Sequence, residues 1–158
     1  MLDLNLPPAI SRTNLEYAWH YQDQEGQPLL ISCRYKCPKK GKRFLPYHMN
    51  EAGNWKIGAG KQPYPLFGLN LLRYYDTSNV VYIAEGEKAT AALQYLELLG
   101  ITSPFGAESC TKADWSPLKA YKQFVILPDH DTSGQKYAEE VAKTLLLINS
   151  EASVSDQF

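Results

Sequence analysis

The sequence lacks any run of about 18 apolar residues, so no segment is long enough to cross a lipid bilayer. Residues 1–8 also lack the basic start and apolar stretch of a signal peptide, and we therefore expect a cytoplasmic protein without a membrane partner. Cysteine is scarce: the 158 residues contain three. Such an odd, sparse set is unlike the paired framework of a secreted disulfide-rich protein.

Neither sign of charge is in excess overall, since the net charge is −1, but the two halves of the chain differ. Residues 1–79 contain ten Lys or Arg and six Asp or Glu, whereas residues 80–158 contain six and eleven. A basic first half could bind a phosphate backbone while an acidic second half binds a cation. Chance alone would also produce such a difference.

The first half of the chain reads as an N-terminal arm, residues 1–14, followed by a β-rich subdomain, residues 15–77. Tyr17, Trp19 and Tyr21 alternate with other residues, as in a strand, and residues 24–27 form a turn. Further strands are expected over 29–35, 44–49 and 55–57, because aromatic and β-branched residues lie between turn residues there. A short helix is expected around Leu69 and Leu72.

Residues 78–158 predict an α/β core in which strands alternate with helices. Strands are expected over 80–84, 101–105 and 124–127, and residues 152–158 begin a last strand within which the sequence ends. One helix is expected over 87–99, with Ala92, Leu93, Leu96 and Leu99 on its apolar stripe and Gly100 as terminator. A second follows a cap at Thr132 or Ser133. This order implies a parallel sheet flanked by helices, with ligands at the carboxyl ends of its strands.

The helix that follows the cap at Thr132 or Ser133 is expected to place four residues on its core face. These residues are Tyr137, Val141, Leu145 and Ile148.

Acidic residues directly follow two of these apolar strands. Glu85 comes after the first, and Asp129 and Asp131 come after the strand over 124–127. If the strands are neighbours, the three carboxylates converge, and they repel one another unless a cation or a proton neutralises them. Ligands that are all oxygen favour Mg²⁺ or Mn²⁺ over zinc. Gly86 would let a substrate phosphate approach the backbone closely.

Three short segments carry a recognisable pattern: residues 84–88 (Ala-Glu-Gly-Glu-Lys), residues 113–118 (Ala-Asp-Trp-Ser-Pro-Leu) and residues 127–131 (Leu-Pro-Asp-His-Asp) with Gly134. With these segments the chain resembles the Toprim domain, and in particular the primase-like proteins of phages, plasmids and other mobile elements. The resemblance implies a Toprim-like fold over residues 78–158. It implies that Glu85 is the general acid/base and that Asp129 and Asp131 bind Mg²⁺.

What the resemblance implies for function is primer synthesis, a metal-dependent nucleotidyl transfer. Its expected partners are single-stranded DNA and nucleotides, and a helicase or other replication protein. A further Asp, often found four residues after the motif Glu, is Ala89 here, and the zinc finger and helicase of such primases are missing. A Toprim nuclease and a non-catalytic nucleic-acid-binding module therefore remain alternatives, and the three acids alone could simply favour helix starts.

A basic segment in the first half could bind nucleic acid. Six of the ten residues 34–43 are basic, and Phe44 lies beside them, which suits single-stranded nucleic acid. The six are Arg34, Lys36, Lys39, Lys40, Lys42 and Arg43. A solvated hairpin tip would look the same. Lys88 and Lys112, in segments that border the acids, could contact phosphate or could be ordinary surface residues.

Two other metal patterns are weaker. Residues 129–140 match the calcium loop of an EF-hand, but the segment before them reads as a strand where an EF-hand needs a helix. Cys33, Cys37 and His48 lack the usual zinc spacing and a fourth ligand.

Overall fold

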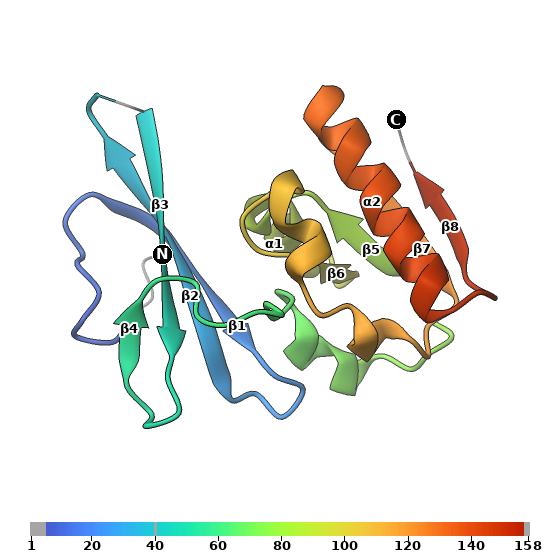
Figure 1. Ribbon diagram of the computed structural model, residues 1–158, viewed down its shortest axis with the longest axis horizontal. Coiled ribbons are helices and arrows are strands. Elements are labelled where there is room, and N and C mark those ends of the chain that lie inside the picture. Colours follow the sequence, from blue (N-terminus) through green and yellow to red (C-terminus); the bar gives the residue numbers. More distant parts are fainter. Residues whose placement is uncertain (1–5, 40, 157–158) are drawn as a thin grey trace.

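The computed structural model describes residues 6–39 and 41–156 of the chain. They form two four-stranded sheets that lie beside each other (Figure 1). The first sheet is antiparallel, in the order β1-β2-β3-β4, and consists of Leu15–Gln22, Pro28–Cys37, Gly41–Met49 and Trp55–Ile57. These are the four strands expected from the alternating pattern.

The two faces of the antiparallel sheet are both used. Residues directly opposite each other in an antiparallel pair share a face, so Trp19, Ser32 and Pro46 lie on one face. The other face carries buried Ile31, and Leu6 and Ile10 pack into the same apolar cluster. The described part of the predicted arm therefore covers the outer face of this sheet.

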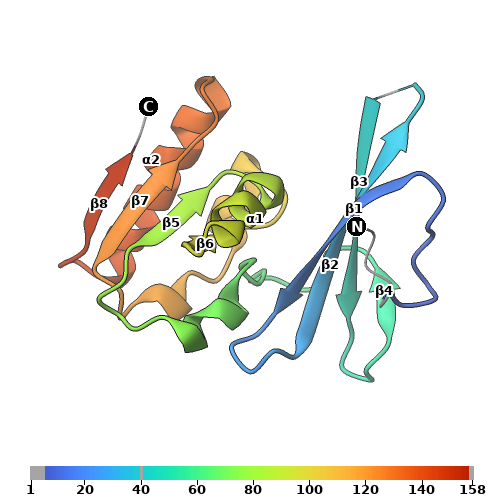
Figure 2. The same cartoon turned by 180° about the vertical axis from the view of Figure 1, so that it is seen from behind.

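The second sheet is parallel and contains the expected strands over 80–84, 124–127 and 152–158, whereas the strand expected over 101–105 lies two residues earlier and ends at Ile101. Its order is β6-β5-β7-β8, from Leu99–Ile101, Val81–Ala84, Gln123–Leu127 and Ser153–Asp156. Two α-helices, α1 (Glu87–Tyr95) and α2 (Thr132–Ile148), pack on it, and Figure 2 shows the strands from behind. The 3₁₀ helices η1, η2 and η3 span Leu69–Tyr74, Ala107–Lys112 and Ser116–Leu118. The predicted α/β class, a parallel sheet with helices preceded by a β-rich part, is confirmed.

Helix α2 buries the face that its sequence predicts. Tyr137, Val141 and Leu145 are buried in the main apolar cluster, and Ile148 is partly buried against it. Their spacing of three or four residues places them on one stripe of the helix. The stripe packs with buried side chains of β5 and β7, such as Ile83 and Ile126, in one apolar cluster. This packing holds α2 against the sheet.

The prediction for α1 was wrong at its C-terminal end. The helix stops at Tyr95, and Glu97 adopts a left-handed φ of 59°. The amide of Leu98 donates to the carbonyl of Leu93 and that of Glu97 to Gln94, which is a Schellman motif. Leu99, expected on the helix, is buried in β6 instead.

The predicted apolar stripe of α1 was also wrong. Ala92 and Leu96 are exposed, Leu96 to 65%, and the buried helix residues are Glu87 and Thr90. Gly100 lies within β6 and does not terminate the helix. A side chain at Gly100 would lie 3.0 Å from the carbonyl oxygen of Thr90, so this glycine lets the helix pack closely on the strand.

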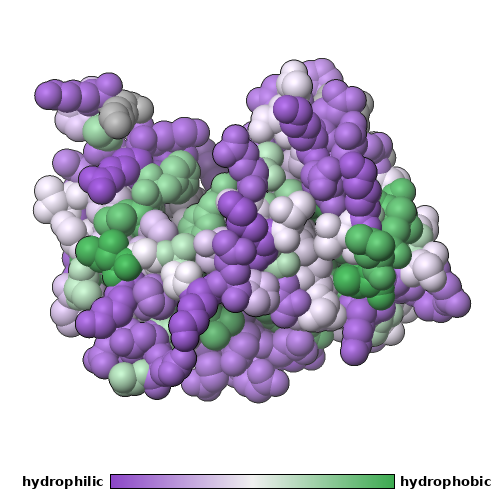
Figure 3. Space-filling model, viewed as in Figure 1, coloured by the Kyte–Doolittle hydropathy of each residue, from purple (hydrophilic) through white to green (hydrophobic). Residues whose placement is uncertain are grey.

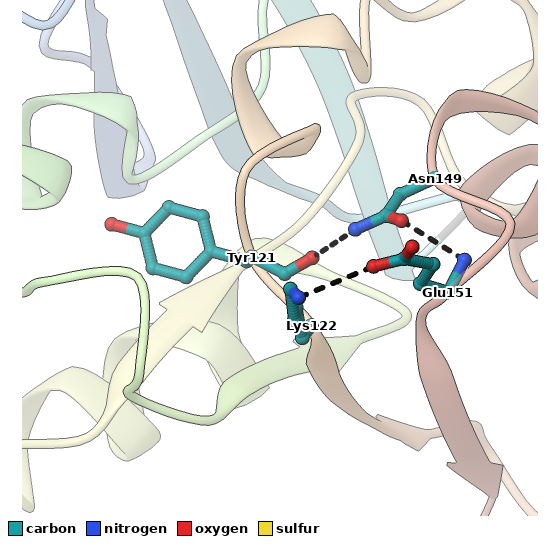
Figure 4. Close-up of polar contacts among 4 residues, drawn as sticks. All are labelled: Tyr121, Lys122, Asn149 and Glu151. Atoms are coloured by element: carbon teal, nitrogen blue, oxygen red, sulfur yellow. Dashed lines mark hydrogen bonds and ion pairs between the residues drawn. The ribbon is translucent and has the colours of Figure 1, made fainter.

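Polar contacts hold the edge strand β8 beside β7. The side-chain amide of Asn149 donates to the carbonyl of Tyr121 at 2.9 Å, and Lys122 pairs with Glu151 at 3.2 Å (Figure 4). The amide of Ser153 donates to the carbonyl of Lys122. These contacts link the turn after α2 to the start of β7, so α2 and β7 are tied together at the end opposite the acidic residues.

The two sheets are joined by an apolar cluster and by one buried polar contact. Tyr21 and Leu30 of the antiparallel sheet pack with Phe67, whose backbone pairs with Thr102 next to β6. The hydroxyl of Tyr21 donates to Glu87 Oε1 at 2.9 Å, at the first turn of α1. No helix in the described part of the chain is long and apolar enough to span a membrane.

Candidate active site

The two acid-bearing strands are neighbours. Strand β5 pairs with β7 in parallel, with Ala84 opposite Leu127. From β5 the chain moves to β6 on one side and then crosses to β7 on the other, so the strand order reverses between β5 and β7. Ligands of such sheets bind at the carboxyl ends of the strands at this switch point. Glu85 and Asp129 lie there.

Glu85 and Asp129 are in direct contact. The backbone amide of Asp129 donates to Glu85 Oε2 at 3.1 Å. Burial raises the pKa of Glu85 above its usual value, the hydrogen bond from Asp129 opposes this, and the negative charges of Asp129 and Asp131 raise it further. A carboxylate of raised pKa beside other acids is an environment suited to taking up a proton or a cation.

Asp131 has a structural contact of its own. Its Oδ1 accepts a hydrogen bond from the amide of Gly134 at 2.8 Å, so Asp131 is the N-cap of α2. The prediction that Thr132 or Ser133 would cap the helix was wrong. One carboxylate oxygen of Asp131 is thus held by the helix start, which leaves its other oxygen for a ligand.

Gly134 allows the start of α2 to touch the acidic loop. A Cβ at this position would lie 1.9 Å from the carbonyl oxygen of Asp129, far closer than any real contact. By contrast, a Cβ at Gly86 would meet no atom within 4 Å, and the φ of Gly86 is −152°. The two glycines therefore have different roles: Gly134 is needed for close packing of α2 on the acidic loop, and Gly86 leaves open space beside Glu85.

Alanine substitutions should separate these two roles. We expect Gly134→Ala to lower the free energy of unfolding by about 1–3 kcal/mol, because backbone must move to admit the methyl group. Gly86→Ala should change it by less than about 1 kcal/mol, since the extended φ suits alanine while the helix-cap position slightly favours glycine. Denaturant unfolding of both variants measures the difference, and equal losses would contradict it.

The donor chemistry fits a hard cation that is only partly held by protein. In residues 6–39 and 41–156, no three His, Cys, Asp or Glu side chains are grouped so as to hold a metal. Mg²⁺ is commonly held by one or two carboxylates, and water and substrate phosphates complete its coordination. Glu85 and Asp129, which line the same cleft, would be such a pair. The expected ligand set of Glu85, Asp129 and Asp131, for Mg²⁺ or Mn²⁺, stays a prediction.

The raised pKa of Glu85 predicts a pH-dependent stability. The folded state binds the Glu85 proton more tightly than the unfolded chain, so ionisation of Glu85 as the pH rises destabilises the fold. In buffer free of divalent cations, Glu85→Gln should therefore raise the melting temperature at pH 7. The gain should vanish as the pH falls to where Glu85 is protonated. A melting-temperature difference that does not change with pH would contradict this.

A cleft of about 790 Å³ opens beside the acids, between the two sheets. It is lined by both Glu85 and Asp129, by Gly86 to Ala89 at the start of α1, and by residues of the antiparallel sheet. The hollow at the upper edge of Figure 3, between the two parts of the molecule, shows this opening on the surface. A cavity of this size can accommodate a nucleotide-sized ligand.

The opposite wall of the cleft is aromatic and basic. Trp19 stacks between Tyr17 and Phe44, with ring centroids 5.3 Å and 6.4 Å away. Arg34 lies over Tyr17 and Lys42 over Phe44. Trp19, Arg34, Lys42 and Phe44 all line the cleft, and Phe44 is 45% exposed. Rings beside cations form a surface suited to stacked bases and phosphates.

The basic residues expected to bind nucleic acid separate into groups. Arg34 and Lys42 line the cleft, and Lys36, directly opposite Lys42, shares their face. Arg43 points to the other face of β3, and Lys39 is exposed in the β2–β3 turn. Lys40 lies outside the described residues.

The two lysines near the acids also differ. Lys88 lines the cleft and its Nζ lies 5.8 Å from the centre of the Tyr17 ring, so it reaches across from α1 to β1. Lys112 ends η2, where its carbonyl accepts from the amide of Tyr64, and it does not belong to the cleft lining. Trp19 and Glu87 line the cleft but were missed as site residues. The alternating pattern around Trp19 was visible in the sequence. It predicts a strand, but it does not show which part of the protein that strand faces.

Several solved primase structures have this architecture. The chain aligns with the E. coli primase catalytic core at 13% identity and a TM-score of 0.64, over 89% of this chain and 43% of that one. It aligns with the primase fragment of the bacteriophage T7 primase-helicase protein at 18% identity and a TM-score of 0.61, over 89% of this chain and 52% of that one. The chain shares the fold of primase catalytic cores.

The likeness extends to a third source and has clear limits. The Aquifex aeolicus primase (zinc-binding and RNA polymerase domains) aligns at 16% identity and a TM-score of 0.63, over 90% of this chain and 37% of that one. The chain thus spans between 37% and 52% of the length of these three solved chains. No protein-family model matches the sequence, and no curated protein matches it either. At these identities the comparison concerns the fold.

Proposed function

We propose that this chain catalyses metal-dependent nucleotidyl transfer on single-stranded DNA, the chemistry of primer synthesis. The observation that carries the proposal is the cleft itself: two carboxylates, Glu85 and Asp129, face a wall of stacked rings and cations. Acids that can hold a cation and a surface that can hold bases and phosphates are the two things this reaction needs. The shared fold with primase catalytic cores supports it.

The residues of the chain divide the work in this proposal. Asp129 and the oxygen of Asp131 that does not cap α2 would hold the cation, with Glu85 beside them. A bound Mg²⁺ would neutralise phosphate charge at the reacting centre. Glu85, whose pKa is raised, would take the proton from the attacking hydroxyl, and Lys88 would contact a phosphate oxygen. Gly86 leaves room for that phosphate.

The proposed partners follow from the same cleft. A single DNA strand would lie across β1, β2 and β3, with phosphates near Arg34 and Lys42 and a base against Phe44. The nucleotide would lie between this wall and Glu85. A helicase or another replication protein is the proposed larger partner, and a phage, plasmid or other mobile element the proposed setting. The T7 structure in the comparison comes from a primase-helicase protein.

One incubation tests the proposal. The full chain is mixed with single-stranded template, labelled nucleotides and Mg²⁺ or Mn²⁺. The products are separated on a denaturing gel, and a native gel of the same mixture shows whether template is bound. New labelled oligonucleotides that disappear when the cation is chelated are the expected result. Shortened template would instead identify a nuclease with the same acids, and retarded template without product would identify a binding module. Either outcome overturns nucleotidyl transfer.

A further inference from the structure

Tyr137 connects α2 to the strand that carries Glu85. Its ring is fully buried in the main apolar cluster, and its hydroxyl donates to the carbonyl of Ala84 at 3.0 Å. The residue after Ala84 is Glu85. Because a peptide unit is planar, a contact that fixes the Ala84 carbonyl also fixes the plane that leads to the Cα of Glu85.

The same helix also holds the other acid-bearing loop. In its first turn, Asp131 caps α2 and Gly134 touches the carbonyl of Asp129. Tyr137 lies about one turn later on the same helix. The first two turns of α2 therefore contact the ends of both β5 and β7, which are the two strands that position the acids.

The Tyr137 hydroxyl is a stable donor. Burial raises its pKa to about 12, against the lowering influence of the neighbouring hydroxyls of Thr102 and Ser103. The Thr102 hydroxyl lies 3.4 Å away. The phenol therefore keeps its proton throughout the working pH range, and the bond to Ala84 persists.

We propose that Tyr137 is a positioning residue, whose hydroxyl holds Glu85 in place relative to Asp129 through the carbonyl of Ala84. The inference rests on the proposed function, because it assigns to Tyr137 the support of the proposed catalytic and cation-holding pair. Groups that hydrogen-bond directly to metal ligands typically contribute about 10–100-fold to metal affinity or activity, and a contact one peptide away is expected at the lower end of that range. An apolar ring at this position would supply packing but not this support.

The chain offers a matched control. Tyr121 is also buried in the main apolar cluster, and its hydroxyl donates to a backbone carbonyl, that of Tyr75, at 2.9 Å. Tyr75 follows η1, ten residues before Glu85 in the sequence. Tyr121→Phe therefore removes the same kind of bond from the same core without touching the peptide before Glu85.

The test measures Mn²⁺ affinity by electron paramagnetic resonance for the full-length wild type, Tyr137→Phe, Tyr121→Phe, Glu85→Gln and the double variant of Glu85 and Tyr137. We expect Tyr137→Phe to weaken Mn²⁺ binding about tenfold and Tyr121→Phe to change it less than about twofold. The double variant should bind Mn²⁺ as Glu85→Gln does, because a residue that acts through Glu85 adds nothing once Glu85 is replaced. In primer synthesis, Tyr137→Phe should lower kcat and leave the nucleotide KM unchanged.

The outcomes separate the two claims. The positioning role is overturned if Tyr137→Phe binds Mn²⁺ like the wild type, if Tyr121→Phe loses as much, or if the losses multiply in the double variant. A wild type that binds no Mn²⁺ overturns it as well. A wild type that shows the expected Mn²⁺ pattern but forms no oligonucleotide leaves the positioning role standing and overturns the proposed function.

Discussion

Asp129→Asn is expected to reduce nucleotidyl transfer by about 100-fold or more, because it removes one negative charge from the position proposed to hold the cation. Asparagine keeps the shape of the side chain, and the bond to Glu85 comes from the backbone amide of residue 129, which the substitution leaves in place. Removing a like charge beside Glu85 should not weaken the fold. Initial rates of primer synthesis at saturating Mg²⁺, together with a melting curve, measure both effects.

A charge-matched control accompanies this substitution. Glu139→Gln removes one negative charge from the exposed surface of α2 and should leave the rate within about twofold, since exposed charges away from a site interact weakly with it. If Asp129→Asn retained wild-type activity, the carboxylate would have no part in the reaction. If Glu139→Gln lost as much, the loss would reflect net charge and not the site.

Phe44→Ala should weaken binding of single-stranded DNA by about 1–3 kcal/mol, the usual contribution of a ring that stacks on a base. Phe44 is 45% exposed on the cleft face of β3 and is not a member of a buried apolar cluster, although its ring stacks on buried Trp19. The neighbouring cation gives a second measure. Lys42→Ala should lose one phosphate contact. The negative slope of log affinity against log salt should therefore become shallower by about 0.7. Fluorescence anisotropy of a labelled oligonucleotide over a salt series measures both.

The alternation of side chains along β3 supplies the control for this experiment. Arg43 is adjacent to Lys42 and carries the same charge, but it points to the opposite face of the sheet. Arg43→Ala should therefore change neither the affinity nor the salt slope beyond that of any surface charge. Equal effects of Lys42→Ala and Arg43→Ala would mean that the bound DNA does not lie along the cleft face of β3.

The placement of the acids was predictable because it follows from a general rule of parallel sheets. Apolar strands that alternate with helices predict a parallel sheet, and the carboxyl ends of neighbouring strands share an edge. Glu85 and Asp129 each follow such a strand, and the pairing of β5 with β7 brings them together. The role of Asp131 as a helix cap was also within reach, since aspartate is among the best N-cap residues.

The end of α1 was not predictable from local pattern. Leu99 continues the helical spacing and Gly100 is a common terminator, but Leu99 is buried in β6, and the helix ends earlier at a left-handed Glu97. The carbonyl of Glu97 accepts a bond from the hydroxyl of Tyr75, a contact 22 residues away in sequence. Tertiary contacts of this kind override the local preference of a segment.

The second wall of the cleft was only half predictable. The cations near residue 40 indicated nucleic acid, but their distribution between two faces depends on the register of β2 with β3. Trp19 lines the cleft because Tyr21, on the same strand and face, packs against Phe67 and donates a hydrogen bond to Glu87, and these contacts join the two sheets. Those contacts join residues that are 46 and 66 positions apart in sequence, and one sequence by itself carries no signal of them.

The bond between Tyr21 and Glu87 also determines how the chain can be shortened for experiments. A fragment that begins at residue 78 would keep Glu85, Asp129 and Asp131 but would leave Glu87 without its hydroxyl donor. The same cut would uncover Ala91 and Phe105, which pack against the Trp19–Tyr21–Phe67 cluster. Newly bared apolar surface promotes self-association. Expression of the acidic half alone should therefore yield aggregated material, and a usable truncation retains the chain from β1 onward.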